Sequence, residues 1–128
     1  MIIISTQCYF PNIGGIEALM TGMAQAFKRN GIEVMVFADG KINEYDKCQD
    51  FRLLRFNHWK PIRRRLKAKQ INRLVKSKNI ELIIADSWKS AEHLNILGAK
   101  LLILAHGTEI QKIPFNIFNF HKHYKNLR

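Results

Sequence analysis

Two adjacent glycines, Gly14 and Gly15, are the first residues whose type and spacing suggest chemistry. An apolar run over residues 1–5 precedes them, and after them apolar residues recur at the spacing of one helix face. Glycines permit positive φ and close approach of a ligand to backbone amides. Because the start of a helix carries unpaired N–H groups and the positive end of the dipole, the pattern predicts an anion site, typically for phosphate. A tight turn that only packs helix against strand explains the same residues.

His106 is the second candidate, because it directly follows an apolar run and Gly107 comes after it. A neutral imidazole donates or accepts a hydrogen bond near neutral pH, and the glycine leaves room for a ligand. A histidine that stabilises its own turn is the alternative. Glu109 lies just beyond and either contacts a ligand or caps the next segment.

Alternating strands and helices are predicted to position these residues. Strands are expected at residues 2–6, 32–38, 51–56, 81–85 and 101–105, and helices at residues 15–30, 61–78 and 88–97. The polar residues 39–50 are expected to cross between strands. Continuous apolar runs are typical of strands that are buried on both faces. The predicted fold class is therefore α/β, a Rossmann-like parallel sheet flanked by helices.

The carboxyl ends of the predicted strands form the expected site. Open parallel sheets bind ligands outside these ends, where the strand order reverses. Segments 7–17, 86–89 and 106–109 follow strands and should therefore meet at one edge. Within them, Asp86, Ser87 and Lys89 are interpreted as capping residues, and the helix dipole explains Glu17.

The positive charge is concentrated in one predicted helix. Residues 60–78 contain nine basic residues and no acidic one, in a chain of net charge +11. The nine are Lys60, Arg63, Arg64, Arg65, Lys67, Lys69, Arg73, Lys76 and Lys78. A basic helix with apolar residues and Trp59 at its start favours an anionic membrane surface, and the first seven of the nine are the predicted docking residues. A solvated helix face and a nucleic-acid surface are alternatives. No nucleic acid is expected, because no aromatic residues interleave the charges as a stacking platform.

Length and composition narrow the class of protein. A chain of 128 residues suits one domain with a core of its own. Cys8 and Cys48 fit neither a disulfide framework nor a zinc pattern, so no metal site is predicted and a cytoplasmic location is expected. No signal segment and no segment long enough to cross a bilayer is recognised.

Three segments in order resemble the glycosyltransferase family 4 enzymes, which have the GT-B fold. The first is Gly-Gly-Ile-Glu at residues 14–17, with a helix that ends near residue 31 and a strand over residues 32–37. The others are residues 81–88 and 100–109, the latter with a His-Gly turn and an acidic residue beyond it. By this resemblance, residues 1–112 form the N-terminal, acceptor-side domain, and residues 113–128 begin a truncated connecting segment.

The resemblance implies a retaining glycosyltransferase of hexosyltransferase type. Such an enzyme transfers a sugar from a nucleotide-diphosphate donor to a lipid-linked or cell-envelope glycan acceptor, without a cofactor or an obligatory metal. The family pattern places His106 beside the transferred sugar as the catalytic candidate. It places Gly14, Gly15, Gly107 and Glu109 in substrate binding.

Family members that glycosylate lipids are similar in carrying a basic membrane-docking patch on this domain. The resemblance therefore implies a peripheral location at the inner face of the plasma membrane. GT-B enzymes also need a C-terminal domain that binds most of the nucleotide sugar, and this sequence lacks one, so the isolated chain is expected to be inactive. The alternative from another class is a non-catalytic α/β module that binds an anionic membrane or nucleic acid through residues 60–78.

Overall fold

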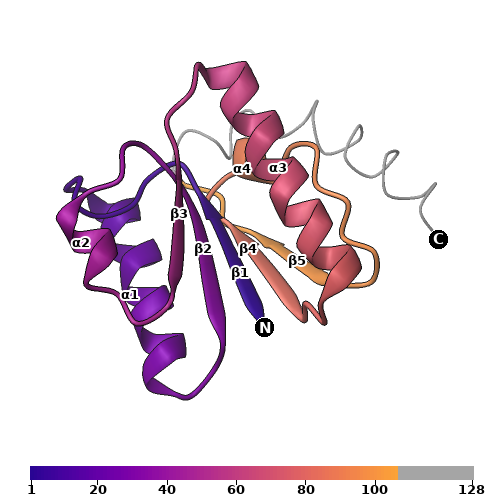
Figure 1. The fold of residues 1–128 in the computed structure, drawn as a ribbon, viewed down its shortest axis with the longest axis horizontal. Coiled ribbons are helices and arrows are strands. Elements are labelled where there is room, and N and C mark those ends of the chain that lie inside the picture. Colours follow the sequence, from indigo (N-terminus) through magenta and orange to yellow (C-terminus); the bar gives the residue numbers. More distant parts are fainter. Residues whose placement is uncertain (107–128) are drawn as a thin grey trace.

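Five parallel strands form the centre of the structure, a computed structural model that describes residues 1–106 (Figure 1). The strands are β1 (Ile2–Thr6), β2 (Val34–Asp39), β3 (Arg52–Phe56), β4 (Leu82–Ala85) and β5 (Lys100–Ile103). The helices are α1 (Gly15–Arg29), α2 (Glu44–Lys47), α3 (Lys60–Ser77) and α4 (Trp88–Ala91). Every strand pair is parallel, so the predicted α/β class with a Rossmann-like sheet is confirmed.

The order of the strands in the sheet is β3-β2-β1-β4-β5. The chain builds outward from β1 to β3, then crosses back and adds β4 and β5 on the other side of β1. The order therefore reverses between β1 and β4, and Ser5 of β1 lies beside Ala85 of β4 at that point. This is the place at which open parallel sheets bind ligands.

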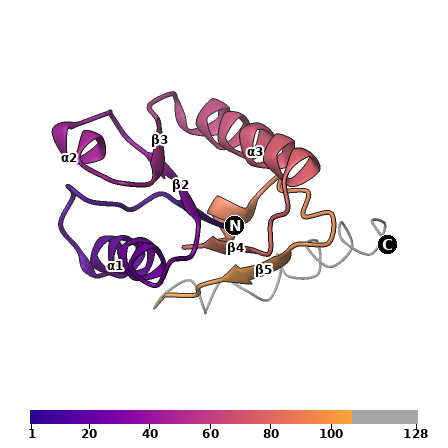
Figure 2. The ribbon, with the colours of Figure 1, turned by 60° about the horizontal axis from the view of Figure 1, so that its bottom comes forward.

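Alternate residues of the central strands pack into two cores, one on each face of the sheet. Ile3 and Phe37 belong to the core under α3 and α4, whereas Ile4 and Val36 belong to the core under α1. Figure 2 shows α1 on one face of the sheet and α3 on the other. Burial on both faces explains why β1, β2 and β4 are continuous apolar runs in the sequence.

Helix α1 forms where the sequence predicts it, beginning at the second of the two glycines. Met20 and Ala24 on one of its faces are buried against the sheet. The helix ends at Arg29, and Gly31 beyond it has φ 74°, in the left-handed region that favours glycine. Because α1 follows β1, its first turn lies on the side of the sheet where the strands end, the carboxyl edge.

Two helices differ from the expected pattern. Residues 39–50 contain the short helix α2, which starts with a capping box in which Asn43 and Asp46 bind each other's backbone N–H groups. Helix α4 ends at Ala91 rather than near residue 97, because Glu92 takes an extended ψ of 137° and His93 after it takes φ 66°. Asn72 of α3 stabilises this path, since it donates to the His93 carbonyl (3.0 Å) and accepts from the Asn95 amide (2.7 Å). These tertiary hydrogen bonds override the local helical period.

Candidate functional site

Asp86, the residue after β4, holds the segment that follows β1. Its Oδ2 accepts hydrogen bonds from the Thr6 hydroxyl (2.7 Å), the Gln7 amide (2.8 Å) and the Cys8 amide (3.3 Å). The carboxylate is buried. Asp86 therefore joins the two strands on either side of the reversal and sets the path of the chain that leads to Gly14.

The second carboxylate oxygen of Asp86 faces α4. Oδ1 accepts hydrogen bonds from the hydroxyls of Ser87 (3.3 Å) and Ser90. Ser87 also accepts from the Ser90 amide (3.4 Å) and is the N-cap of α4, which confirms its predicted capping role. Asp86 has a different role from the predicted one, because its carboxylate bridges strands and does not cap the helix. Lys89 lies over the Trp88 ring, with Nζ 5.8 Å from the centroid.

A second buried carboxylate, Asp39, lies at the end of β2 and meets two cations of α3. Lys67 Nζ is 2.7 Å from Asp39 Oδ1 and also donates to the Thr6 carbonyl (3.0 Å), while Arg63 Nε is 3.0 Å from Asp39 Oδ2. Only 2% of Lys67 is exposed. Burial lowers the pKa of Lys67 from its usual 10.5, and the charge of Asp39 offsets only part of this effect.

These contacts make one polar network across the carboxyl edge of β2, β1 and β4. It runs from Asp39 through Lys67 to Thr6 and from Thr6 to Asp86. Asp39, Thr6 and the structural role of Lys67 were not predicted from the sequence. The available signals were the carboxylates that end two apolar strands, and the i, i+4 spacing that puts Lys67 on the same helix face as the buried Ile71.

The glycine turn differs from its predicted geometry. Gly14 has φ 174° and ψ 171°, which is extended backbone, and Gly15 is the first residue of α1. The expected positive φ at this pair is therefore wrong. The close approach at Gly14 comes from the Glu17 carboxylate, which a Cβ at Gly14 would overlap, whereas a Cβ at Gly15 would meet no atom within 4 Å. Glu17 lies in the first turn of α1, as the dipole argument expects.

The segment between β1 and α1 is anchored at one end and exposed at the other. Tyr9 is fully buried, and the Phe10 amide donates to Thr21 Oγ1 (3.2 Å), while the Arg55 guanidinium donates to the Phe10 carbonyl. Beyond Phe10, residues 11–15 are exposed, and 97% of Ile13 is accessible. The glycines thus lie on an exposed turn whose base is rigidly held.

His106 leaves the sheet at the same edge, three residues after the end of β5. It is half-buried, and its buried Nε2 has no hydrogen-bond partner within residues 1–106. The buried Nε2 of Gln7, which follows β1, also has no partner in this part of the chain. Gly107 and Glu109 lie outside the described residues. No group of three or more potential metal ligands occurs among residues 1–106.

The predicted docking residues of α3 fall into two groups. Arg63, Arg64 and Lys67 form ion pairs with Asp39 or Glu92, and none of the three is exposed. Lys67 was predicted to lie on a docking surface, and this prediction is wrong because its side chain is buried. The other four, Lys60, Arg65, Lys69 and Arg73, are exposed and have no ion pair within the described part of the chain.

A parallel sheet with polar residues gathered at the reversal of its strand order defines a Rossmann-like α/β domain. The family model Glycosyltransferase Family 4 matches residues 13–128, and the chain belongs to this family. The comparison with curated proteins found no match, and neither did the comparison with solved structures. None of the helices in residues 1–106 has the length and apolar character needed to cross a membrane.

Proposed function

We propose that this chain is the acceptor-side domain of a retaining glycosyltransferase. The transferred sugar would come from a nucleotide-diphosphate donor and go to a lipid-linked or cell-envelope glycan. Family membership supports glycosyl transfer. The site is assigned from one observation, the reversal of strand order between β1 and β4. The exposed glycine turn and the anchored loop after β1 lie at the carboxyl edge of these two strands.

The chemistry expected at this edge is electrostatic. Sugar transfer develops positive charge on the sugar and negative charge on the leaving diphosphate. Preorganised hydrogen-bond donors orient the reacting groups and stabilise the negative charge. The Nε2 atoms of His106 and Gln7, which have no partner within residues 1–106, are suitable hydrogen-bonding groups, and the first amides of α1 offer the positive end of its dipole. In this proposal His106 contacts the transferred sugar, with Gly14 and Gly15 close to the substrates. Gly107 and Glu109 complete the proposed substrate site.

The partner of this edge is proposed to be a C-terminal GT-B domain that supplies most contacts to the nucleotide. Exposed apolar residues precede the two glycines, since 41% of Phe10 and 97% of Ile13 are accessible. Such residues are suited to contact a facing domain, and the site between the two domains would exclude water around the reacting sugar.

Transfer activity tests the role of His106. The chain is joined to a C-terminal GT-B domain, and sugar transfer is compared for wild type, His106→Ala and the control His58→Ala, which changes an exposed histidine outside the site. We expect His106→Ala to abolish transfer with an unchanged circular dichroism spectrum, and His58→Ala to retain it. Near wild-type transfer by a folded His106→Ala variant would refute the assignment.

A peripheral location at the inner face of the plasma membrane is proposed from the first turn of α3. Trp59 and Ile62 are 75% and 49% exposed, and Lys60 between them is also exposed. Apolar anchors beside a cation are the composition that anionic lipid surfaces attract. Flotation should show binding to vesicles of phosphatidylglycerol and not to vesicles of phosphatidylcholine. Trp59→Ser should weaken binding and Ile42→Ser, at a 73% exposed residue elsewhere, should not; equal loss in both variants would reject this docking site.

A non-catalytic module that binds an anionic surface is the second candidate function. It is favoured by the exposed cations of α3, which have no ion pair among the described residues. Transfer by the two-domain protein that depends on His106 would reject this candidate, since a binding module needs no such residue.

A further inference from the structure

A stripe of four exposed cations runs along one face of α3. Arg65, Lys69, Arg73 and Lys76 follow one another at intervals of four, four and three residues. At 100° per residue these positions fall within an arc of about 80°, and at 1.5 Å per residue they span about 16 Å. All four are exposed, and none has an ion pair within residues 1–106.

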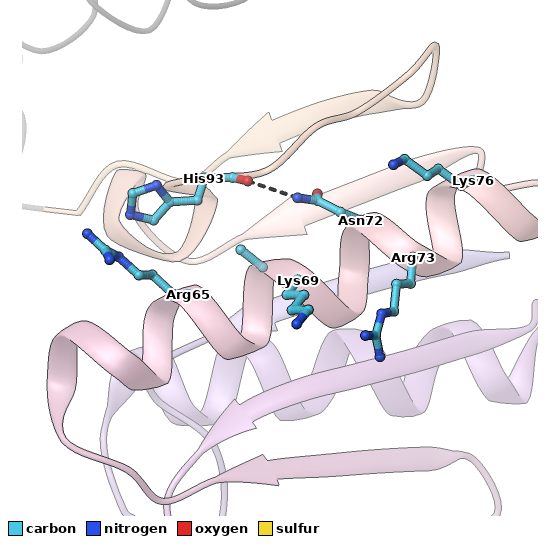
Figure 3. Close-up of a pocket in the computed structure, with 7 residues that line it drawn as sticks. Arg65, Lys69, Asn72, Arg73, Lys76 and His93 are labelled. Atoms are coloured by element: carbon cyan, nitrogen blue, oxygen red, sulfur yellow. Dashed lines mark hydrogen bonds between the residues drawn. The ribbon is translucent and has the colours of Figure 1, made fainter.

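The stripe borders an open groove of about 540 Å³ between α3 and the segment after α4 (Figure 3). The groove is lined by Arg65, Ala68, Lys69, Asn72, Arg73, Lys76 and His93. Its far wall is held in place by Asn72, whose Nδ2 donates to the His93 carbonyl (3.0 Å). Five basic side chains and no acidic one therefore line the groove.

Acidic residues do not neutralise the stripe. Glu92, which precedes His93, is paired with Arg64 at 3.5 Å and lies 3.7 Å from His93. Like charges at i, i+4 destabilise a helix, so four of them on one face cost stability that a single acidic substitution would recover. An external anion would offset this repulsion.

The lining of the groove selects among anionic ligands. Ala68 is its only apolar lining residue, whereas helices that lie in a membrane surface insert large apolar side chains. The exposed anchors of α3, Trp59 and Ile62, are near its first turn and do not line the groove. Among the described residues that line it there is no Phe, Tyr or Trp, and single-stranded nucleic acid is held largely by stacking on such rings. These absences favour an extended, hydrophilic polyanion.

We infer that the groove binds an acidic segment of the glycan acceptor, whose carboxylate or phosphate groups pair with the stripe. Helix α3 begins at the carboxyl edge of the sheet, where Arg63 and Lys67 contact Asp39, and its later turns lead away from that edge. An acceptor whose reacting end lies at the edge would therefore run along Arg65, Lys69 and successive cations. The identity of this polyanion as an acceptor rests on the proposed function, whereas its binding in the groove does not.

Binding to the full 128-residue chain tests the inference directly. The probes are an oligogalacturonate, a neutral maltooligosaccharide of equal length, phosphatidylglycerol vesicles and an oligodeoxythymidylate, at equal salt. We expect calorimetry to detect the oligogalacturonate and not the neutral oligosaccharide. Amide shifts in nuclear magnetic resonance spectra should concentrate at residues 65–76 and His93.

Charge reversal supplies the matched comparison. Lys69→Glu/Arg73→Glu should weaken oligogalacturonate binding about tenfold or more, since two exposed charge pairs are lost and two repulsions gained. Lys28→Glu/Lys41→Glu makes the same change in net charge at exposed lysines outside the groove and should change affinity less than about twofold. Both variants are checked for folding by circular dichroism.

Several outcomes would overturn the inference. The first is that the neutral oligosaccharide binds as tightly as the oligogalacturonate. The second is that both double variants lose the same affinity for the oligogalacturonate. The third is that the vesicles or the oligonucleotide bind to the stripe more tightly than the oligogalacturonate does. Failure of the proposed function gives a different result, namely binding of the oligogalacturonate in the groove by a two-domain protein that transfers sugar to no acceptor.

Discussion

Lys67→Met removes the cation that ties α3 to the carboxyl edge of the sheet. Methionine keeps the length and most of the apolar stem of lysine and cannot donate a hydrogen bond. The substitution leaves the Thr6 carbonyl without its 3.0 Å donor and leaves Asp39 without its 2.7 Å partner. It therefore tests whether α3 is held by this buried pair or only by its apolar contacts.

The expected loss of stability follows from these contacts. Removal of one partner of a buried ion pair typically costs about 3–5 kcal/mol, because the other charge remains buried. Here Asp39 keeps Arg63 at 3.0 Å, which reduces this penalty. The lost hydrogen bond to Thr6 adds about 1 kcal/mol. We expect Lys67→Met to lower the free energy of unfolding by about 2–4 kcal/mol.

The same residue predicts a dependence on pH. The folded-state pKa of Lys67 is lowered below 10.5, so between the folded pKa and 10.5 the unfolded chain binds a proton that the folded chain does not. Stability should therefore rise with pH across that window, and this contribution should be absent from Lys67→Met. Burial also raises the pKa of Tyr9, so stability should fall in both proteins above about pH 10, where the tyrosine of the unfolded chain ionises. The effect of Lys67 is therefore read from the difference in the free energy of unfolding between wild type and Lys67→Met.

Urea unfolding at several pH values measures both effects. Lys69→Met is the control, since Lys69 is exposed two residues further along α3, and its effect should stay within about 0.5 kcal/mol. If Lys67→Met were as stable as wild type, apolar contacts alone would hold α3, and the buried pair would not be what holds the helix. A parallel pH dependence in both proteins would refute the titration argument.

Three further variants test other parts of the structure. Asp86→Ala should lower the free energy of unfolding by about 3–5 kcal/mol in urea, because several buried donors lose their acceptor; a loss under about 1 kcal/mol would contradict the bridging role. Gly15→Ala should raise thermal stability by up to about 1 kcal/mol, since the added Cβ meets no atom within 4 Å and alanine favours a helix; destabilisation would show that the turn needs glycine. Lys69→Glu should stabilise the protein by about 0.5–1 kcal/mol at low salt through i, i+4 pairs with Arg65 and Arg73, and salt should abolish the gain.

Strands were predictable from the sequence because both faces of the sheet are covered. The continuous apolar runs of β1 and β4 permit little other interpretation, and α1 follows from its period after the glycines. Helix α4 was overpredicted, because its early end depends on Asn72, which is distant in sequence. Helix α2 was missed, because a four-residue helix has too few residues to show a period.

The candidate site was only partly predictable. The edge follows from topology, and the positions of Gly14 and His106 at it follow from the order of elements. The backbone of Gly14 was not predictable, because extended geometry at a glycine leaves no mark in the sequence. Lys67 was misjudged, because a charge run is usually solvated and composition does not show which of its members finds a buried carboxylate.

The charge balance of the network bears on how an anionic donor would be held. Asp39 and Asp86 carry two negative charges at the carboxyl edge, and Arg63 and Lys67 carry two positive ones. The network is therefore close to neutral and offers a diphosphate no net attraction. Attraction at this edge would come from the first amides of α1, from Lys89, which has no ion pair within residues 1–106, or from the proposed facing domain. Arg65, Lys69, Arg73 and Lys76 lie instead on the exposed face of α3, so the proposed polyanionic acceptor and the anionic donor would be bound by different groups.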